Sequence, residues 1–226
     1  MAKPGKRYRG DLEKVKDMVP VTVAEAVAKV KSFGPTKYDQ SVDLCVHLGV
    51  DPKHADQNVR GSVSLPHGTG KTKRVIAFCN PDKVDDAKAG GAIEAGGEDL
   101  VKKVEEGWMD FDVAIASPDM MRVVSKLGRV LGPRGLMPSP KGGTVTPDVG
   151  NAVKEYAAGK VEFRNDAGGN VHVPVGKLGF DGQKLVENIE HFMAVINKMR
   201  PSTTKGQYVK RISLSGTMTP GVDIEL

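Results

Sequence analysis

A chain of 226 residues with 39% hydrophobic residues is long enough to bury one large core or two modest ones. Its formal net charge of +5 and its isoelectric point near 9.1 favour polyanionic partners such as nucleic acid. Aromatic residues make up only 5%, which argues against broad stacking on single-stranded bases, and no apolar run approaches the ~18 residues that cross a bilayer. We therefore expect a cytoplasmic protein without a membrane anchor.

The first part of the chain predicts one helix followed by two strands. Thr22 and Glu25 have the spacing of a capping box, and valines follow at helical spacing until Gly34. Alternating apolar and polar residues predict a strand over 41–48, and a shorter strand is expected over 59–65.

From residue 67 the pattern changes to strands that alternate with helices. The predicted strands cover 74–79 and 111–116, and the predicted helices cover 84–89, 99–106, 118–130 and 149–158. This order is typical of a small parallel sheet of α/β type.

From Gly159 the chain returns to strands. Segments 160–164 and 170–175 flank a turn and predict a β-hairpin. Asp181 is expected to cap a long amphipathic helix that ends before Pro201. The last two predicted strands cover 208–214 and 222–226.

Strand-rich ends therefore flank an α/β segment, and we expect a mixed α+β and α/β fold in two domains. A discontinuous α+β domain would combine residues 1–66 with 159–226, and a nested α/β domain would cover 67–158. The nested segment holds 13 basic and 13 acidic residues, so the whole net charge lies on the discontinuous domain. A polyanion should be attracted mainly to that domain.

Two motifs suggest catalysis and neither is complete. The run HGTGKT at 67–72 is similar to the end of a nucleotide-binding P-loop, but Leu65 stands where the pattern needs glycine, and a strand follows instead of a helix. A turn between domains is the favoured interpretation. Asp110 and Asp112 have no accompanying histidine, serine or ligand set, and the five histidines lack metal-ligand spacing. We expect no enzyme activity, no cofactor and no metal.

The most distinctive run is SKLGRVLGPRGLMPSPK at 125–141, in which three glycines and three prolines punctuate four cations. It could grip phosphate, because glycine allows close backbone approach and the cations supply countercharge. Alternatively, Gly128 and Gly132 let a helix end close to a sheet while the prolines fix the exit. The neutral total charge of the nested segment favours the second interpretation.

The motif TMTP at 217–220 lies between two predicted strands. It is either a plain turn or a soft surface for a nucleoside, formed by an exposed Met218 beside two hydroxyls. In the second case Thr217 and Thr219 could bond to phosphate or to a ribose 2′-hydroxyl. The pattern leaves both alternatives open.

Several long motifs, in order, resemble the family of the first protein of the large ribosomal subunit, the L-one family. They are GKRYR at 5–9, DQNVRGSVSLPHGTGK at 56–71, GWMDFD at 107–112, the run at 125–141, VEFRND at 161–166 and PVGK at 174–177. The resemblance implies a split α+β domain hinged to a nested Rossmann-like α/β domain. It also implies a structural protein that acts on the ribosome in the cytoplasm.

The same resemblance implies partners. The chain would bind the stalk helices of large-subunit rRNA, mainly through the split domain, next to other large-subunit components. Family members also assist release of deacylated tRNA from the exit site. Bacterial members repress translation of their own operon by binding its mRNA.

Carried over onto this sequence, the family's RNA surface comprises two groups of residues. They are Lys37, Tyr38 and Ser41 near the first long strand, and Thr217, Met218 and Thr219 at the C-terminal turn. The chain departs from the family at Tyr38, where Phe is usual, and at Thr219, where Gly is usual. The candidates for the electrostatic share of binding are Lys37, Arg60, Arg164, Lys177 and Arg211.

Overall fold

The computed structural model describes residues 5–16, 18–54 and 56–225. It divides the chain into two units, one made of residues 1–70 and 163–226 and the other of residues 71–162. Both divisions lie four residues later than the boundaries expected from the sequence. We call the two parts the discontinuous unit and the nested unit.

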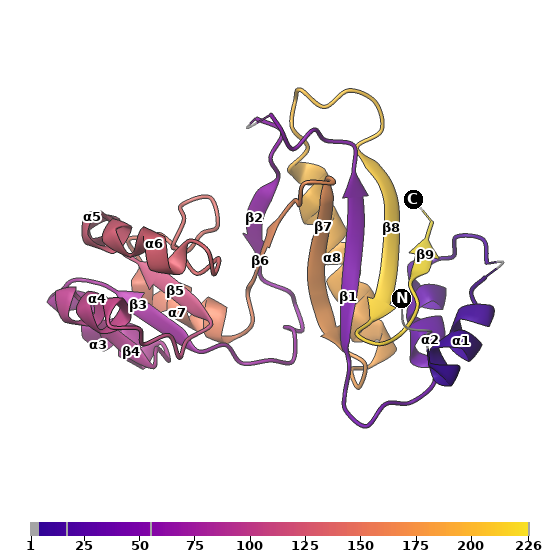
Figure 1. Ribbon diagram of the computed structural model, residues 1–226, viewed down its shortest axis with the longest axis horizontal. Coiled ribbons are helices and arrows are strands. Elements are labelled where there is room, and N and C mark those ends of the chain that lie inside the picture. Colours follow the sequence, from indigo (N-terminus) through magenta and orange to yellow (C-terminus); the bar gives the residue numbers. More distant parts are fainter. Residues whose placement is uncertain (1–4, 17, 55, 226) are drawn as a thin grey trace. The chain divides into compact units, whose positions relative to one another are not determined.

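The discontinuous unit contains a four-stranded antiparallel sheet. Its strands are β1 (Ser41–Leu48), β7 (Asn170–Lys177), β8 (Val209–Gly216) and β9 (Val222–Ile224). The order is β7-β1-β8-β9, so that β1 lies between β7 and β8 (Figure 1). Burial alternates along β1, as its sequence predicts, because every second side chain points into the core. The sheet therefore has one buried face and one partly exposed polar face.

Two helices pack on this unit's core. They are α2 (Val23–Lys31) and α8 (Gly182–Lys198). The predicted capping box is confirmed, because Thr22 Oγ1 accepts from the Glu25 amide and the Glu25 carboxylate accepts from the Thr22 amide. Asp181 occupies the N-cap position of α8, as the sequence predicts. Its side chain is exposed and makes no capping hydrogen bond to the helix.

The hairpin predicted around residues 166–169 is also wrong. Strand β6 (Val161–Arg164) pairs with β2 (Arg60–Val63), whereas β7 pairs with β1. Between β6 and β7 there is only an isolated bridge, from Asn165 to Val171. The reason is a long-range pair: Asn165 and Val59 exchange hydrogen bonds of 2.9 and 3.0 Å, which keep this end of β6 beside β2.

The nested unit is built on a three-stranded parallel sheet, which confirms the predicted sheet type. The strands are β3 (Val75–Phe78), β4 (Glu94–Gly96) and β5 (Val113–Ala116), in the order β4-β3-β5. Helices α3 (Val84–Ala89), α4 (Glu98–Glu105) and α7 (Val149–Ala157) pack around it. Every residue of β3 is fully buried, because side chains from helices cover both faces.

The single helix expected over 118–130 is a series of shorter segments. They are two 3₁₀ turns, Pro118–Met120 and Ser125–Leu127, with α5 (Met121–Val124) and α6 (Gly128–Leu131) after them (Figure 1). The backbone stays helical at each junction. This winding keeps Met120, Val124, Leu127 and Leu131 in the core of the unit.

Candidate RNA interface

The two groups of predicted RNA-binding residues meet at one end of the antiparallel sheet. Val42 of β1 lies opposite Gly216 of β8, so the residues before the one strand adjoin the residues after the other. Thr217 donates its amide to the Ser41 carbonyl at 3.1 Å, and its Oγ1 accepts from the Ser41 amide at 3.2 Å. We call residues 37–41 and 217–219 the corner.

A tight turn in the corner presents Met218 to solvent. The side chain of Gln40 is buried, and its Oε1 accepts a 2.8 Å hydrogen bond from the Met218 amide. The Thr219 amide donates to the carbonyl of Gly216. Met218 itself is 50% exposed, so the turn supplies a soft apolar side chain beside polar backbone groups.

Thr219 does not share this exposure. It is only 9% exposed, and its Oγ1 accepts a 2.8 Å hydrogen bond from the Gly216 amide. The same hydroxyl can donate to the Pro220 carbonyl at 3.2 Å. The Thr219 hydroxyl is therefore bonded within the turn.

The other side of the corner carries an aromatic ring and two cations. Tyr38 is 53% exposed, and its carbonyl accepts a 2.7 Å hydrogen bond from Thr36 Oγ1. Lys37 is exposed beside it. Lys177 lies opposite Ser41 in the sheet and donates to the carbonyl of Asp39 at 3.2 Å. Besides Lys37, Lys177 is thus a second predicted cation that the sheet register brings to the corner.

The remaining predicted cations lie elsewhere. Arg211 lies opposite His47, near the far end of β1, and its guanidinium is paired with Asp223 at 2.6 and 2.9 Å. Arg60 and Arg164 belong to the two-stranded sheet of β2 and β6. Their contribution to RNA binding stays a prediction.

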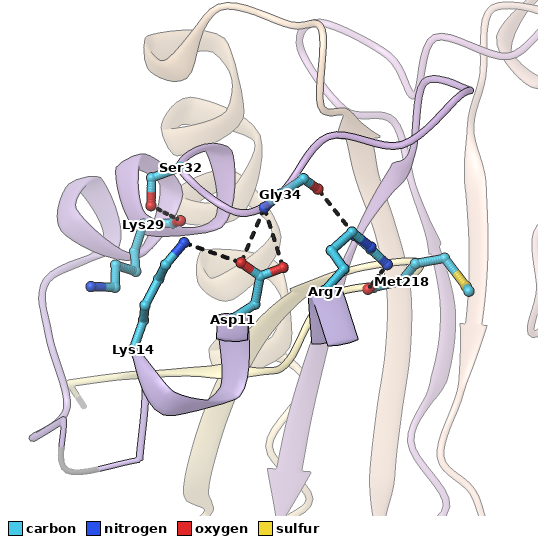
Figure 2. A network of polar contacts seen from close by, with 7 residues as sticks. All are labelled: Arg7, Asp11, Lys14, Lys29, Ser32, Gly34 and Met218. Carbon is cyan, nitrogen blue, oxygen red and sulfur yellow. Dashed lines mark hydrogen bonds and ion pairs between the residues drawn. The ribbon is translucent and has the colours of Figure 1, made fainter. Parts of the chain in front are cut away.

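A short helix that the sequence pattern did not predict supports the corner. In α1 (Lys6–Glu13), Arg7 Nη2 donates to the Met218 carbonyl at 2.8 Å and Nη1 donates to the Gly34 carbonyl at 3.0 Å. The carboxylate of Asp11, which is 3% exposed, accepts from the Gly34 amide at 3.1 and 3.2 Å and pairs with Lys14. Figure 2 shows these residues converging on the loop after α2. The sequence signals Arg7 through the motif GKRYR at 5–9, whereas Asp11 lies outside that motif.

The motifs that suggested catalysis have structural partners. Arg74 donates to both Asp110 and Asp112 at 3.2 Å, and its side-chain and backbone hydrogen bonds to Asp112 hold the pKa of that carboxyl below its usual value. The run at 67–72 forms turns that lead into strand β3. In the described part of the chain, no cluster of His, Cys, Asp or Glu could hold a metal ion, and no helix has the length and apolarity to cross a membrane.

Comparison with known proteins decides the family. The model of the "Ribosomal protein L1p/L10e family" matches residues 28–220, a range that includes both sides of the corner. The chain belongs to this family. The resemblance noted in the sequence is thereby confirmed.

Two relatives in this family align along almost their whole length. The "Large ribosomal subunit protein uL1" of Chlorobaculum tepidum is 50% identical over 225 residues, which cover 100% of this chain and 97% of the relative. The protein of the same name from Chlorobium chlorochromatii is 51% identical over 222 residues, which cover 98% and 97%.

Proposed function

We propose that this L1p/L10e-family chain, a structural protein of the large ribosomal subunit, binds the stalk region of large-subunit rRNA through the discontinuous unit. Family membership and the printed names of the two relatives support the ribosomal role. The discontinuous unit, residues 1–70 and 163–226, holds 19 basic and 14 acidic residues and thus the entire net charge of +5. We further propose that the nested unit is the family's Rossmann-like domain, without catalytic activity.

The observation that carries this proposal is the corner. Tyr38 and Met218, two large side chains that are 53% and 50% exposed, lie on segments joined by the Ser41–Thr217 hydrogen bonds. The exposed ring of Tyr38 can stack on a base or pack on a ribose of the RNA. The Met218 side chain can pack against the RNA groove next to that nucleotide. Lys37 and Lys177 would contact phosphates and fix the position of the RNA. Hydroxyls of Ser41 and Thr217 are suited to ribose 2′-hydroxyls.

Thr219 would act in a different way from its neighbours. Because its side chain is buried, unlike that of Thr217, and its hydroxyl is bonded to the backbone of Gly216, we propose that it shapes the turn and thereby positions Met218. Gln40 and Arg7 would serve the same purpose, since each holds one backbone group of Met218. Family members that have glycine at this position would need other contacts to hold the turn.

We also propose the two further roles that the family resemblance implies, which are tRNA release and translational repression. The chain would assist release of deacylated tRNA from the exit site as part of the cytoplasmic ribosome, together with other large-subunit components. It would repress translation of its own operon when the corner binds an mRNA segment of the same shape as the stalk rRNA. One surface for both RNAs makes them competitors.

Filter binding to a stalk rRNA fragment tests the proposal. We expect the double variant Met218→Ala, Thr217→Ala to lose about tenfold or more in affinity while it stays folded, because it loses a buried apolar contact and a hydrogen bond, each worth about 1 kcal/mol. Val19→Ala is the matched control, because Val19 is a 76% exposed apolar residue of the same unit outside the corner. Unchanged affinity in a folded double variant would remove the corner from the site. Competition of the operon mRNA with the same fragment tests repression.

A further inference from the structure

The nested unit has no net charge, but its charges are segregated along the chain. The 28 residues from 120 to 147 contain five cations and no acidic residue. The rest of the unit, 71–119 and 148–162, holds nine basic and fourteen acidic residues. The neutral total therefore conceals a basic segment and an acidic remainder. We call the cations of this segment the basic face: Arg122, Lys126, Arg129, Arg134 and Lys141.

Helical geometry puts three of these cations on one side. Arg122, Lys126 and Arg129 are spaced at i, i+4 and i+7 along the helical run that includes α5 and α6. All three are exposed. The buried residues of the same run, Met120, Val124, Leu127 and Leu131, have the same spacing on the opposite side and pack into the core. The buried apolar residues of the run thus hold its three cations at a fixed position on the surface of the unit.

The two remaining cations lie on the loop that follows α6, and hydrogen bonds fasten this loop. Tyr156 donates its hydroxyl to the Gly142 carbonyl at 2.7 Å, next to Lys141. The Ser139 amide donates to Thr144 Oγ1 at 2.8 Å, and Pro138 is buried. Arg134 and Lys141 are exposed on its outer side.

None of the five cations is neutralised by a carboxylate in the described residues. Other cations of the unit do have such partners: Arg74 pairs with Asp110 and Asp112, and Lys103 pairs with Glu94. Exposed cations without carboxylate neighbours keep their full attraction for an anion. A polyanion with regularly spaced charges is the partner that would neutralise several of them at once.

We propose that the basic face binds the phosphate backbone of RNA, as a second contact besides the corner. The choice of RNA as the polyanion rests on the proposed function. No aromatic residue occurs between 120 and 147, so the face offers cations for phosphates and no ring for base stacking. It would therefore bind RNA with little regard to sequence. The acidic remainder of the unit would repel RNA, so only the basic face would turn toward it.

Two triple variants of the full chain separate this proposal from a general effect of charge. The face variant is Arg122→Gln, Lys126→Gln, Arg129→Gln. The matched control is Lys88→Gln, Lys102→Gln, Lys154→Gln, three exposed lysines of the acidic remainder. Both remove three positive charges from the same unit. The probe is an RNA hairpin unrelated to the stalk, and its affinity is measured as a function of salt concentration.

We expect the face variant to bind the hairpin more weakly and to reduce the salt slope by about 2 to 3, at roughly 0.7–0.9 for each lost phosphate contact. The control should keep the slope of the unchanged chain. Equal losses in both variants, or a face variant that binds like the unchanged chain, would overturn the proposal. If the face variant unfolds at a lower temperature, the loop pair Arg134→Gln, Lys141→Gln replaces it, with an expected reduction of about 1 to 2.

The corner and the basic face have separate readouts. Met218→Ala should reduce the preference for the stalk fragment over the hairpin and leave the hairpin's salt slope unchanged. A Met218→Ala chain that keeps its preference would contradict the proposed function and leave the basic face standing. A face variant with an unchanged slope would contradict only the basic face.

Discussion

The guanidinium of Arg7 donates a 2.8 Å hydrogen bond to the carbonyl of Met218, which lies 211 positions later in the chain. The same guanidinium holds the Gly34 carbonyl at 3.0 Å. Arg7 thus connects the helix near the start of the chain to the turn that exposes the Met218 side chain (Figure 2). The position of that side chain depends on contacts from both ends of the sequence.

Arg7→Ala should weaken binding to the stalk fragment several-fold and lower the free energy of unfolding by about 1–2 kcal/mol, because two carbonyls lose a charged donor. Filter binding and urea unfolding measure the two effects. Lys6→Ala removes the same charge from the exposed side of α1 and should have a smaller effect on both. Equal loss of affinity in the two variants would show that Arg7 acts only through its charge.

Thr219→Val should destabilise the chain by about 1–3 kcal/mol, because the buried amide of Gly216 loses the acceptor that it uses at 2.8 Å. Thr219→Ser keeps the acceptor and should unfold at nearly the same urea concentration as the unchanged chain. If the valine variant is as stable as the serine variant, the hydroxyl does not hold the turn.

Tyr38→Phe should keep the affinity for the stalk fragment within about twofold, since the ring remains. Tyr38→Ala should weaken the free energy of binding by about 1–3 kcal/mol, the effect of losing one stacked base. Neither change should alter the melting temperature much, because the side chain is 53% exposed. A phenylalanine variant as weak as the alanine variant would assign the contact to the hydroxyl instead of the ring.

Asp166→Asn should destabilise the chain in a pH-dependent way. Hydrogen bonds from the backbone and side chain of Asn170, and from the Gly168 amide, lower the pKa of Asp166 from its usual 3.8. A carboxyl with a lowered pKa in the folded state stabilises the fold above the unfolded pKa, and this contribution is lost as the pH falls through the folded value. The difference between the variant and the unchanged chain in thermal unfolding should be largest near neutral pH and shrink below 3.8.

Glu190→Gln is the control for this series, because Glu190 is exposed on α8 away from that turn. It should give a smaller and flatter difference across the same pH range. A constant difference for Asp166→Asn would mean that the charge of the carboxylate does not stabilise the turn.

The sequence predicted those elements whose residues carry a local signal. The range of β1 was correct because apolar and polar residues alternate from Ser41 to Leu48, and the start of α2 was correct because Thr22 and Glu25 cap it. Strand β4 was missed because Glu94–Gly96 contains no large apolar side chain. The false hairpin arose because the partner of β6 is set by Asn165 and Val59, which are far apart in sequence.

The candidate site shows the same division. Family resemblance located the exposed residues of the corner, whereas α1 was missed because its one buried residue is Asp11, which is held by polar contacts and belongs to no apolar stripe. Total charge located the excess on the discontinuous unit. It could not show that the neutral nested unit is divided into a basic segment and an acidic remainder, because the total charge of a segment does not depend on where its charged residues lie.

Crosslinking of the bound stalk rRNA fragment to single positions tests the corner most directly. A photoreactive side chain is placed at Met218 in one chain and at Val19 in another, since both positions are exposed in the same unit. We predict that the chain labelled at position 218 crosslinks to the RNA and that an excess of unlabelled fragment abolishes the product, while the chain labelled at position 19 gives little. Equal crosslinking at the two positions, or none at 218 when the RNA is bound, would contradict the account.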